Sequence, residues 1–233
     1  MDGWALARLP SGKNMHDVAI YLGPSLDRAE AESILDANYL PPICRGDLAK
    51  LPEATRIVGI VDGEFFQNLA VSPKEVVALL DRGIQVFGAA SMGALRAAET
   101  YHFGTVGVGE VFQMYRDGVL DGDDEVALAY DRESYAHFSE PLVNIRRALE
   151  LALAARVIDE TEMRGLIQQM KAYYFPDRSY RALQKLCPHL GEFFRNCPPP
   201  DVKREDARKL LLAIRNQRES RPPASVEIFD PSS

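Results

Sequence analysis

Three short apolar runs, each followed by a helical pattern, restrict the possible folds of this chain more than any other feature. The runs cover residues 18–22, 56–61 and 84–87. They are continuous rather than alternating, which is typical of strands buried on both faces. Strands that alternate with helices form a parallel sheet with right-handed crossovers and helices on its faces. The sequence therefore predicts an α/β fold.

Helix start signals follow the first two runs. Asp27 precedes Glu30 by three residues, as in a capping box, and Ser72-Pro73-Lys74-Glu75 combines a cap, a first-turn proline and a returning glutamate. The third run leads through a tight turn into a helix over residues 93–101. Residues 39–47 contain Pro41, Pro42 and Gly46 and are expected to be mostly loop, whereas residues 126–130 are expected to add a strand.

From Ser139 onward the pattern is helical. Helices are predicted over residues 142–155, 160–173, 180–186 and 202–218, the last three started by Asp159, Asp177 and Asp201. The chain thus divides into a loose leader (1–16), an α/β core with a parallel sheet and flanking helices (17–138), an α-helical C-terminal extension (139–218) and a disordered tail (219–233). The core and leader make up about the N-terminal two-thirds.

Charge and composition exclude several classes of protein. A net charge of -7 and a pI near 5.2 argue against nucleic acid as a partner, because phosphate binding relies on clustered Lys and Arg. There is neither a membrane-span pattern nor a signal peptide, so the expected location is cytoplasmic. Three cysteines are too few for a disulfide scaffold, and neither their spacing nor the acidic run at 121–125 matches a metal site. No metal or other cofactor is expected.

The turn Gly88-Ala89-Ala90-Ser91-Met92-Gly93 is the main candidate for chemistry. Its Ala89-x-Ser91-x-Gly93 pattern is close to the G-x-S-x-G nucleophile elbow, in the required strand–turn–helix context. A helix N-terminus beside the serine would provide N–H groups for an anion or an oxyanion. The alternative is that Ser91 only caps the helix.

A serine nucleophile needs a base, and none of the four histidines (His16, His102, His137, His189) is an obvious partner. Lys74 lies in the first turn of a helix, where the positive helix terminus should lower its pKa. The alternative is an ordinary surface lysine. Ser25, in a turn that also ends a strand, is a rival nucleophile that we assign a supporting role.

Ligands of parallel sheets bind at the carboxyl ends of the strands, so Ser25, Asp62, Glu64 and Ser91 should lie along one edge. Asp62 and Glu64 could orient a base or bind a cation, or simply form a turn. Arg96 could clamp a carboxylate, although it and Glu99 also suit a solvated helix face. Two further segments, Arg45-Gly46-Asp47 and Asn144-Ile145-Arg146, are expected to be exposed and available for recognition.

Several blocks resemble the TfuA-like family over about residues 18–158. They include the segments 21–26, 42–48, 57–67, 74–75, 88–99, 103–109, 123–127 and 143–146, among them Gly-Pro-Ser at 23–25, Arg-Gly-Asp at 45–47 and Gly-Ala-Ala-Ser-Met-Gly at 88–93. The resemblance implies an accessory protein to a YcaO enzyme in peptide-backbone thioamidation, during biosynthesis of ribosomal peptide natural products or protein modification.

The resemblance also implies a hydrolase-like Ser–Lys site, which becomes Ser91 and Lys74 in this chain. The implied substrate is a ThiS-like carrier with a C-terminal thiocarboxylate, cleaved to deliver sulfide. The YcaO enzyme and the carrier are the implied partners, with the precursor peptide as a further candidate. Candidates for supporting or substrate-binding roles are Ser25, Asp62, Glu64, Glu75, Met92, Gly93, Arg96 and Arg45.

Two other functions stay open at this stage. One is a non-catalytic module that binds and activates a YcaO enzyme through the acidic turn and the helical extension. The other is a small-anion or nucleotide binder, although the chain lacks both G-x-x-x-x-G-K-[ST] and a G-x-G-x-x-G after a strand.

Overall fold

A five-stranded parallel sheet forms the centre of the computed structural model, which describes residues 17–65 and 69–220. The predicted leader (1–16) and residues 221–233 of the predicted tail lie outside the described residues. The strand order is β2-β1-β3-β4-β5. The strands are β1 (Val18–Tyr21), β2 (Asn38–Leu40), β3 (Ile57–Ile60), β4 (Gln85–Gly88) and β5 (Val106–Gly107). The predicted α/β fold with a parallel sheet is therefore confirmed.

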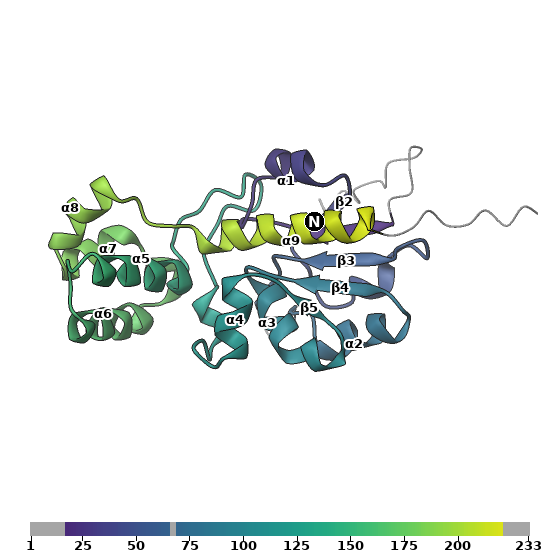
Figure 1. The fold of residues 1–233 in the computed structure, drawn as a ribbon, viewed down its shortest axis with the longest axis horizontal. Coiled ribbons are helices and arrows are strands. Elements are labelled where there is room, and N and C mark those ends of the chain that lie inside the picture. Colours follow the sequence, from purple (N-terminus) through teal and green to yellow (C-terminus); the bar gives the residue numbers. More distant parts are fainter. Residues whose placement is uncertain (1–16, 66–68, 221–233) are drawn as a thin grey trace, which may run out of the picture.

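Helices cover both faces of this sheet, as continuous apolar strands require (Figure 1). On one face, Val18 and Ile20 pack in a core shared with α1 (Arg28–Ile34) and α9 (Val202–Glu219). On the other face, Ala19 and Tyr21 pack in a core shared with α2 (Pro73–Asp81) and the first residue of α3 (Met92–Thr100). Alternate residues of one strand thus serve two separate cores.

The predicted helix starts in the core are confirmed. The Asp27 carboxylate accepts hydrogen bonds from the N–H groups of Ala29 and Glu30 at the start of α1. The Glu30 side chain, however, pairs with Arg204 and Arg208 and does not complete a capping box. Ser72 and Glu75 form the predicted capping box at α2. The helix α4 (Glu110–Arg116) follows β5 and packs on α3 and α9.

A group of four helices extends from one end of the sheet (Figure 1). They are α5 (Leu142–Ala154), α6 (Glu160–Ala172), α7 (Tyr180–Leu186) and α8 (His189–Asn196), and they share a hydrophobic core of their own. α8 was not predicted. α7 is capped by Ser179 rather than by the predicted Asp177, because Asp177 belongs to the short 3-10 turn η4 (Phe175–Asp177).

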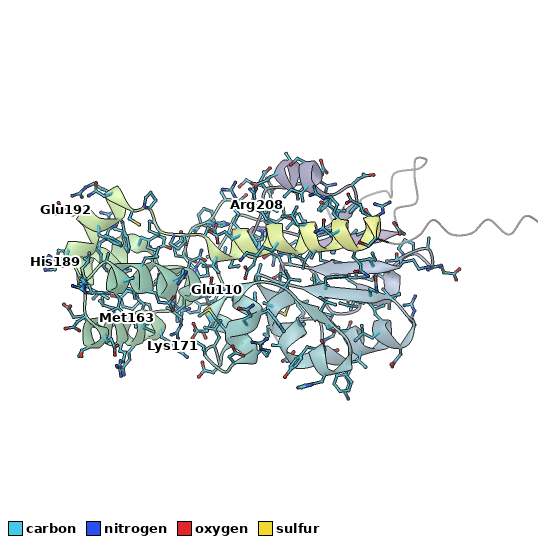
Figure 2. The ribbon with its side chains drawn as sticks, viewed as in Figure 1. Glu110, Met163, Lys171, His189, Glu192 and Arg208 are labelled. Carbon is cyan, nitrogen blue, oxygen red and sulfur yellow. The ribbon has the colours of Figure 1, made fainter. Side chains whose placement is uncertain are left out.

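The last helix, α9, returns from this group to the sheet. Its residues Leu210 and Ile214 lie against Gly59 of β3, where a side chain would collide with both. Arg208 of α9 lies on the side that faces α1 and forms an ion pair with Glu30 (Figure 2). The sequence places residues 202–218 in the helical extension, but their contacts are largely with the α/β layer.

The strand predicted at residues 126–130 is wrong. The 3-10 turn η3 (Asp123–Glu125) precedes an irregular segment in which Tyr130 makes one antiparallel bridge with His137. The backbone of this segment hydrogen-bonds to side chains rather than to a neighbouring strand. The Val126 carbonyl accepts from Lys203, and the Ala129 N–H donates to Ser139. The short strands β2, in a segment expected to be mostly loop, and β5 were not predicted.

Candidate functional site

Ser91 lies at the joint between β4 and α3. Ala90, the residue before it, has φ +66, a left-handed conformation that costs a non-glycine residue roughly 1–2 kcal/mol. Ser91 is 2% exposed, and its hydroxyl makes no capping hydrogen bond to α3. The capping role therefore does not account for this serine.

Small residues allow α3 to approach the sheet closely at this joint. A Cβ on Gly93 would lie 1.7 Å from the carbonyl oxygen of Ile60, and one on Gly88 would lie 2.2 Å from that of Gly93. The Gly93 N–H donates to Val61 at 3.2 Å. Met92 is buried in the core under the sheet. The two predicted supporting residues Met92 and Gly93 thus pack α3, the helix that follows Ser91, against the sheet.

A cavity of about 480 Å³ opens beside Ser91 at the carboxyl edge of the sheet. Asp62 and Glu64, which follow β3, line it together with Ser91, so these predicted residues do meet at one edge. Its other walls come from the irregular segment 126–130, from residues 174–176 of the helical group and from Lys203 of α9. Most of this lining is apolar.

Asp62 organises the turn after β1. Its carboxylate accepts hydrogen bonds from the N–H groups of Gly23 (2.9 Å) and Ser25 (3.0 Å) and from the Ser25 hydroxyl (2.6 Å). Both side chains are buried. The Ser25 hydroxyl is therefore held by Asp62, which fits the supporting role assigned to it. The turn places Pro24, a cavity-lining residue, beside His137, whose Nε2 lies 2.7 Å from the Pro24 carbonyl.

Lys203 is the site residue that sequence reasoning missed. Its side chain is 2% exposed, lines the same cavity as Ser91, and donates from Nζ to the Val126 carbonyl at 2.8 Å. Burial lowers the pKa of Lys203, although the carboxylates of Asp62, Asp201 and Glu140 act in the opposite direction. A lysine that loses its proton more readily is suited to act as a base. One signal was available: Lys203 lies on the apolar stripe of α9 with Ala207, Leu210 and Ile214.

Lys74 lies on a different surface. It is exposed and lines a shallow depression with Glu99 and Phe103, apart from the Ser91 cavity. The cause is the long connection after β3: Arg96 Nε donates to the Val71 carbonyl, so α2 begins beside the middle of α3. Arg96 is five residues beyond Ser91, about 7–8 Å along the helix. The structure therefore does not bring Lys74 into the cavity beside Ser91.

The remaining predicted residues near α2 hold loops together. The Glu75 carboxylate accepts from the Gly46 N–H (2.6 Å) and the Ser72 N–H (2.8 Å), which ties the Arg45-Gly46-Asp47 turn to α2. Arg45 Nε donates to the Ala70 carbonyl. Arg96 pairs with Glu99 on its own helix. None of these three predicted residues lines the Ser91 cavity.

Asn144 and Arg146 are not exposed recognition groups as expected. Asn144 is 4% exposed, and Arg146 is partly buried against Glu125.

Across the described ranges 17–65 and 69–220, no cluster of three or more His, Cys, Asp or Glu side chains is arranged to hold a metal ion. In the same ranges, no helix combines the length and apolarity needed to span a membrane.

The fold and the site together define an α/β protein with a parallel sheet. A cavity at the carboxyl edge of that sheet is lined by a serine at a strand–helix joint and by a buried lysine. The pattern of the TfuA-like protein family matches residues 62–179, about half of the chain, and the chain belongs to this family. TfuA-like proteins are associated with YcaO proteins. A search of curated proteins found no match. The matched region contains Asp62 and Ser91 but neither Ser25 nor Lys203.

Proposed function

We propose that this chain hydrolyses the C-terminal thiocarboxylate of a ThiS-like sulfur carrier and delivers the sulfide to a YcaO enzyme for peptide-backbone thioamidation. The observation that carries the proposal is a single cavity lined by a serine hydroxyl and by a buried lysine of lowered pKa. Membership of a family associated with YcaO proteins supports the partner.

In the proposed reaction, the neutral Lys203 amine takes the proton of the Ser91 hydroxyl as Oγ attacks the thiocarboxylate carbon. The resulting oxyanion lies at the N-terminus of α3. There Gly93 donates to Val61 and Ala94 to Ser91, which leaves the Met92 N–H without an acceptor among the described residues. The C–S bond then breaks as protonated Lys203 gives its proton to the sulfur, which departs as HS⁻ and leaves the amine neutral again. Lys203 then takes a proton from the water that attacks the acyl-serine and returns it to Ser91 Oγ, so the carrier is released with a carboxylate.

A sulfide-release assay on a thiocarboxylated carrier tests this assignment. Ser91→Ala and Lys203→Met should each lower the rate of release by at least about a hundredfold, the contribution typical of a nucleophile or a general base. Methionine suits a buried site in place of lysine, so the fold should survive. Lys74→Met is the matched control, because it removes the sequence-predicted base from an exposed position, and it should keep near wild-type release.

Three outcomes would contradict parts of this proposal. Full release by Ser91→Ala would remove the hydrolase assignment, and full thioamidation supported by Ser91→Ala would favour the non-catalytic YcaO-activating module. Loss of release in Lys74→Met with retention in Lys203→Met would return the base to Lys74.

A further inference from the structure

Asn144 bridges α5 to the beginning of α9. Its Oδ1 accepts the Val202 N–H at 3.0 Å, and its Nδ2 donates to Asp201 Oδ1 at 3.1 Å. Asp201 in turn caps α9 by accepting the Arg204 N–H. Asn144 therefore binds two consecutive residues at the start of α9, immediately before Lys203.

Arg146, two residues further along α5, secures the opposite end of the Lys203 side chain. Its guanidinium forms a two-point ion pair with Glu125, with Nε and Nη2 at 2.9 and 2.8 Å from the carboxylate oxygens. Glu125 is fully buried, and the next residue is Val126, whose carbonyl accepts from Lys203 Nζ. A two-point arginine–carboxylate pair fixes orientation as well as distance.

We propose that Asn144 and Arg146 are positioning residues that hold Lys203 in the Ser91 cavity, Asn144 by fixing its backbone and Arg146 by fixing its Val126 acceptor. This inference rests on the proposed function, in which Lys203 is the base. It gives a role to the Asn144-Ile145-Arg146 segment, which is not part of the cavity lining.

The expected effect on pH dependence follows from the surroundings of Lys203. Burial lowers its pKa, while Asp62 after β3, Asp201 at the cap of α9 and Glu140 before α5 raise it. Loosening the first turn of α9 admits water and weakens the burial effect, so the pKa of Lys203 should rise. Since the neutral amine is the active form, the acidic limb of the activity profile should move to higher pH. A limb that moves up by about one pH unit lowers the rate at any pH below it about tenfold.

The test is the pH profile of kcat/KM for sulfide release. Asn144→Leu should move the acidic limb upward by about one pH unit or more and lose most activity near neutrality, with recovery at high pH. Arg146→Met should move the limb in the same direction. Asn216→Leu is the matched control, because Asn216 is exposed on the same α9 helix, and its profile should be unchanged. A purely structural defect would lower the whole profile without moving its limb.

A swapped pair keeps the test decisive if Asn144→Leu folds poorly. Asn144→Asp alone places a second carboxylate against Asp201 and Glu140, both of which Asn144 contacts, and should be impaired. Combining it with Asp201→Asn restores one amide and one carboxylate at the contact between residues 144 and 201, keeps a good helix cap, and should move the limb back toward that of the wild type. A wild-type limb in Asn144→Leu while Lys203→Met is inactive overturns this inference alone. Full activity of Lys203→Met overturns both the inference and the assigned base.

Discussion

At the scale of single residues, Asp62 is a cavity-lining carboxylate that stabilises a turn of the fold. The sequence suggests it as an orienting group for a base, and it does line the cavity with Ser91. However, its oxygens accept three hydrogen bonds from the turn at Gly23 and Ser25. Its main contact is therefore with the turn that presents Pro24 to the cavity.

Replacing this carboxylate should destabilise the protein strongly. Asp62→Ala leaves three donors without their acceptor in a buried site, and we expect a loss of about 3 kcal/mol or more in the free energy of unfolding. Ser25→Ala removes only one of the three bonds and should cost about 1 kcal/mol while sulfide release persists. Urea unfolding measures both. Equal stability of Asp62→Ala and wild type, or loss of release in a folded Ser25→Ala, would show that these roles are misassigned.

At the scale of elements, the position of α3 decides where Ser91 lies. The helix sits so close to β3 that the space beside Gly93 is filled by the backbone of Ile60. No flexible side chain can move aside there, because the obstacle is a carbonyl group in the central part of the sheet.

A methyl group at two helical glycines should therefore have opposite effects. Gly93→Ala forces α3 away from β3 and should cost about 3 kcal/mol of stability, together with most sulfide release. Gly165→Ala, in the middle of α6 with open space around it, should instead stabilise by about 0.5–1 kcal/mol. Thermal unfolding compares the two. A Gly93→Ala protein as stable and active as wild type would rule out the close approach.

At the scale of the whole molecule, the cavity depends on both the sheet and the helical group. Arg178 joins η3, which lines the cavity, to the end of α6 in the helical group. It is 1% exposed, and it donates to the Met170 carbonyl at the end of α6 and to both the carbonyl and the carboxylate of Asp124 in η3. The cavity-lining segments at η3 and η4 are thus held by one buried guanidinium.

Removing this guanidinium should destabilise both η3 and the end of α6. Arg178→Met removes the guanidinium donor from the carbonyls of Lys171, Tyr173 and Asp124 and should cost about 3 kcal/mol, with faster amide exchange in η3 and at the end of α6. Arg164→Met is the control: Arg164 makes an exposed ion pair with Glu160 on α6, and its loss should change stability by less than about 0.5 kcal/mol. Faster amide exchange in η3 alone, or at the end of α6 alone, would contradict the proposal that Arg178 holds both segments.

The sequence predicted the parallel sheet and the edge where Asp62, Glu64 and Ser91 meet, because continuous apolar runs and capping residues act locally. It could not predict β2 or β5, since strands of two or three residues carry no periodicity. It also predicted Lys74 as the partner of Ser91, whereas Lys203 lines the Ser91 cavity and Lys74 lines a separate depression. Lys74 was predicted from its place in the first turn of a helix, whereas Lys203 reaches the cavity because α9 packs against the sheet, and its place on the apolar stripe of α9 is the local sign of its burial. Similarly, the burial of Asn144 and Arg146 depends on residues far along the chain.

The return of α9 to the sheet has a consequence for how the protein comes into being. On the proposed assignment, the ribosome releases the nucleophile-bearing turn first, and the base follows more than a hundred residues later. At roughly 5–20 residues per second, the nascent chain carries Ser91 without its partner for on the order of ten seconds. If the proposed function holds, a chain still being translated cannot yet release sulfide from a carrier, and release begins only after α9 has been made and has packed on the sheet.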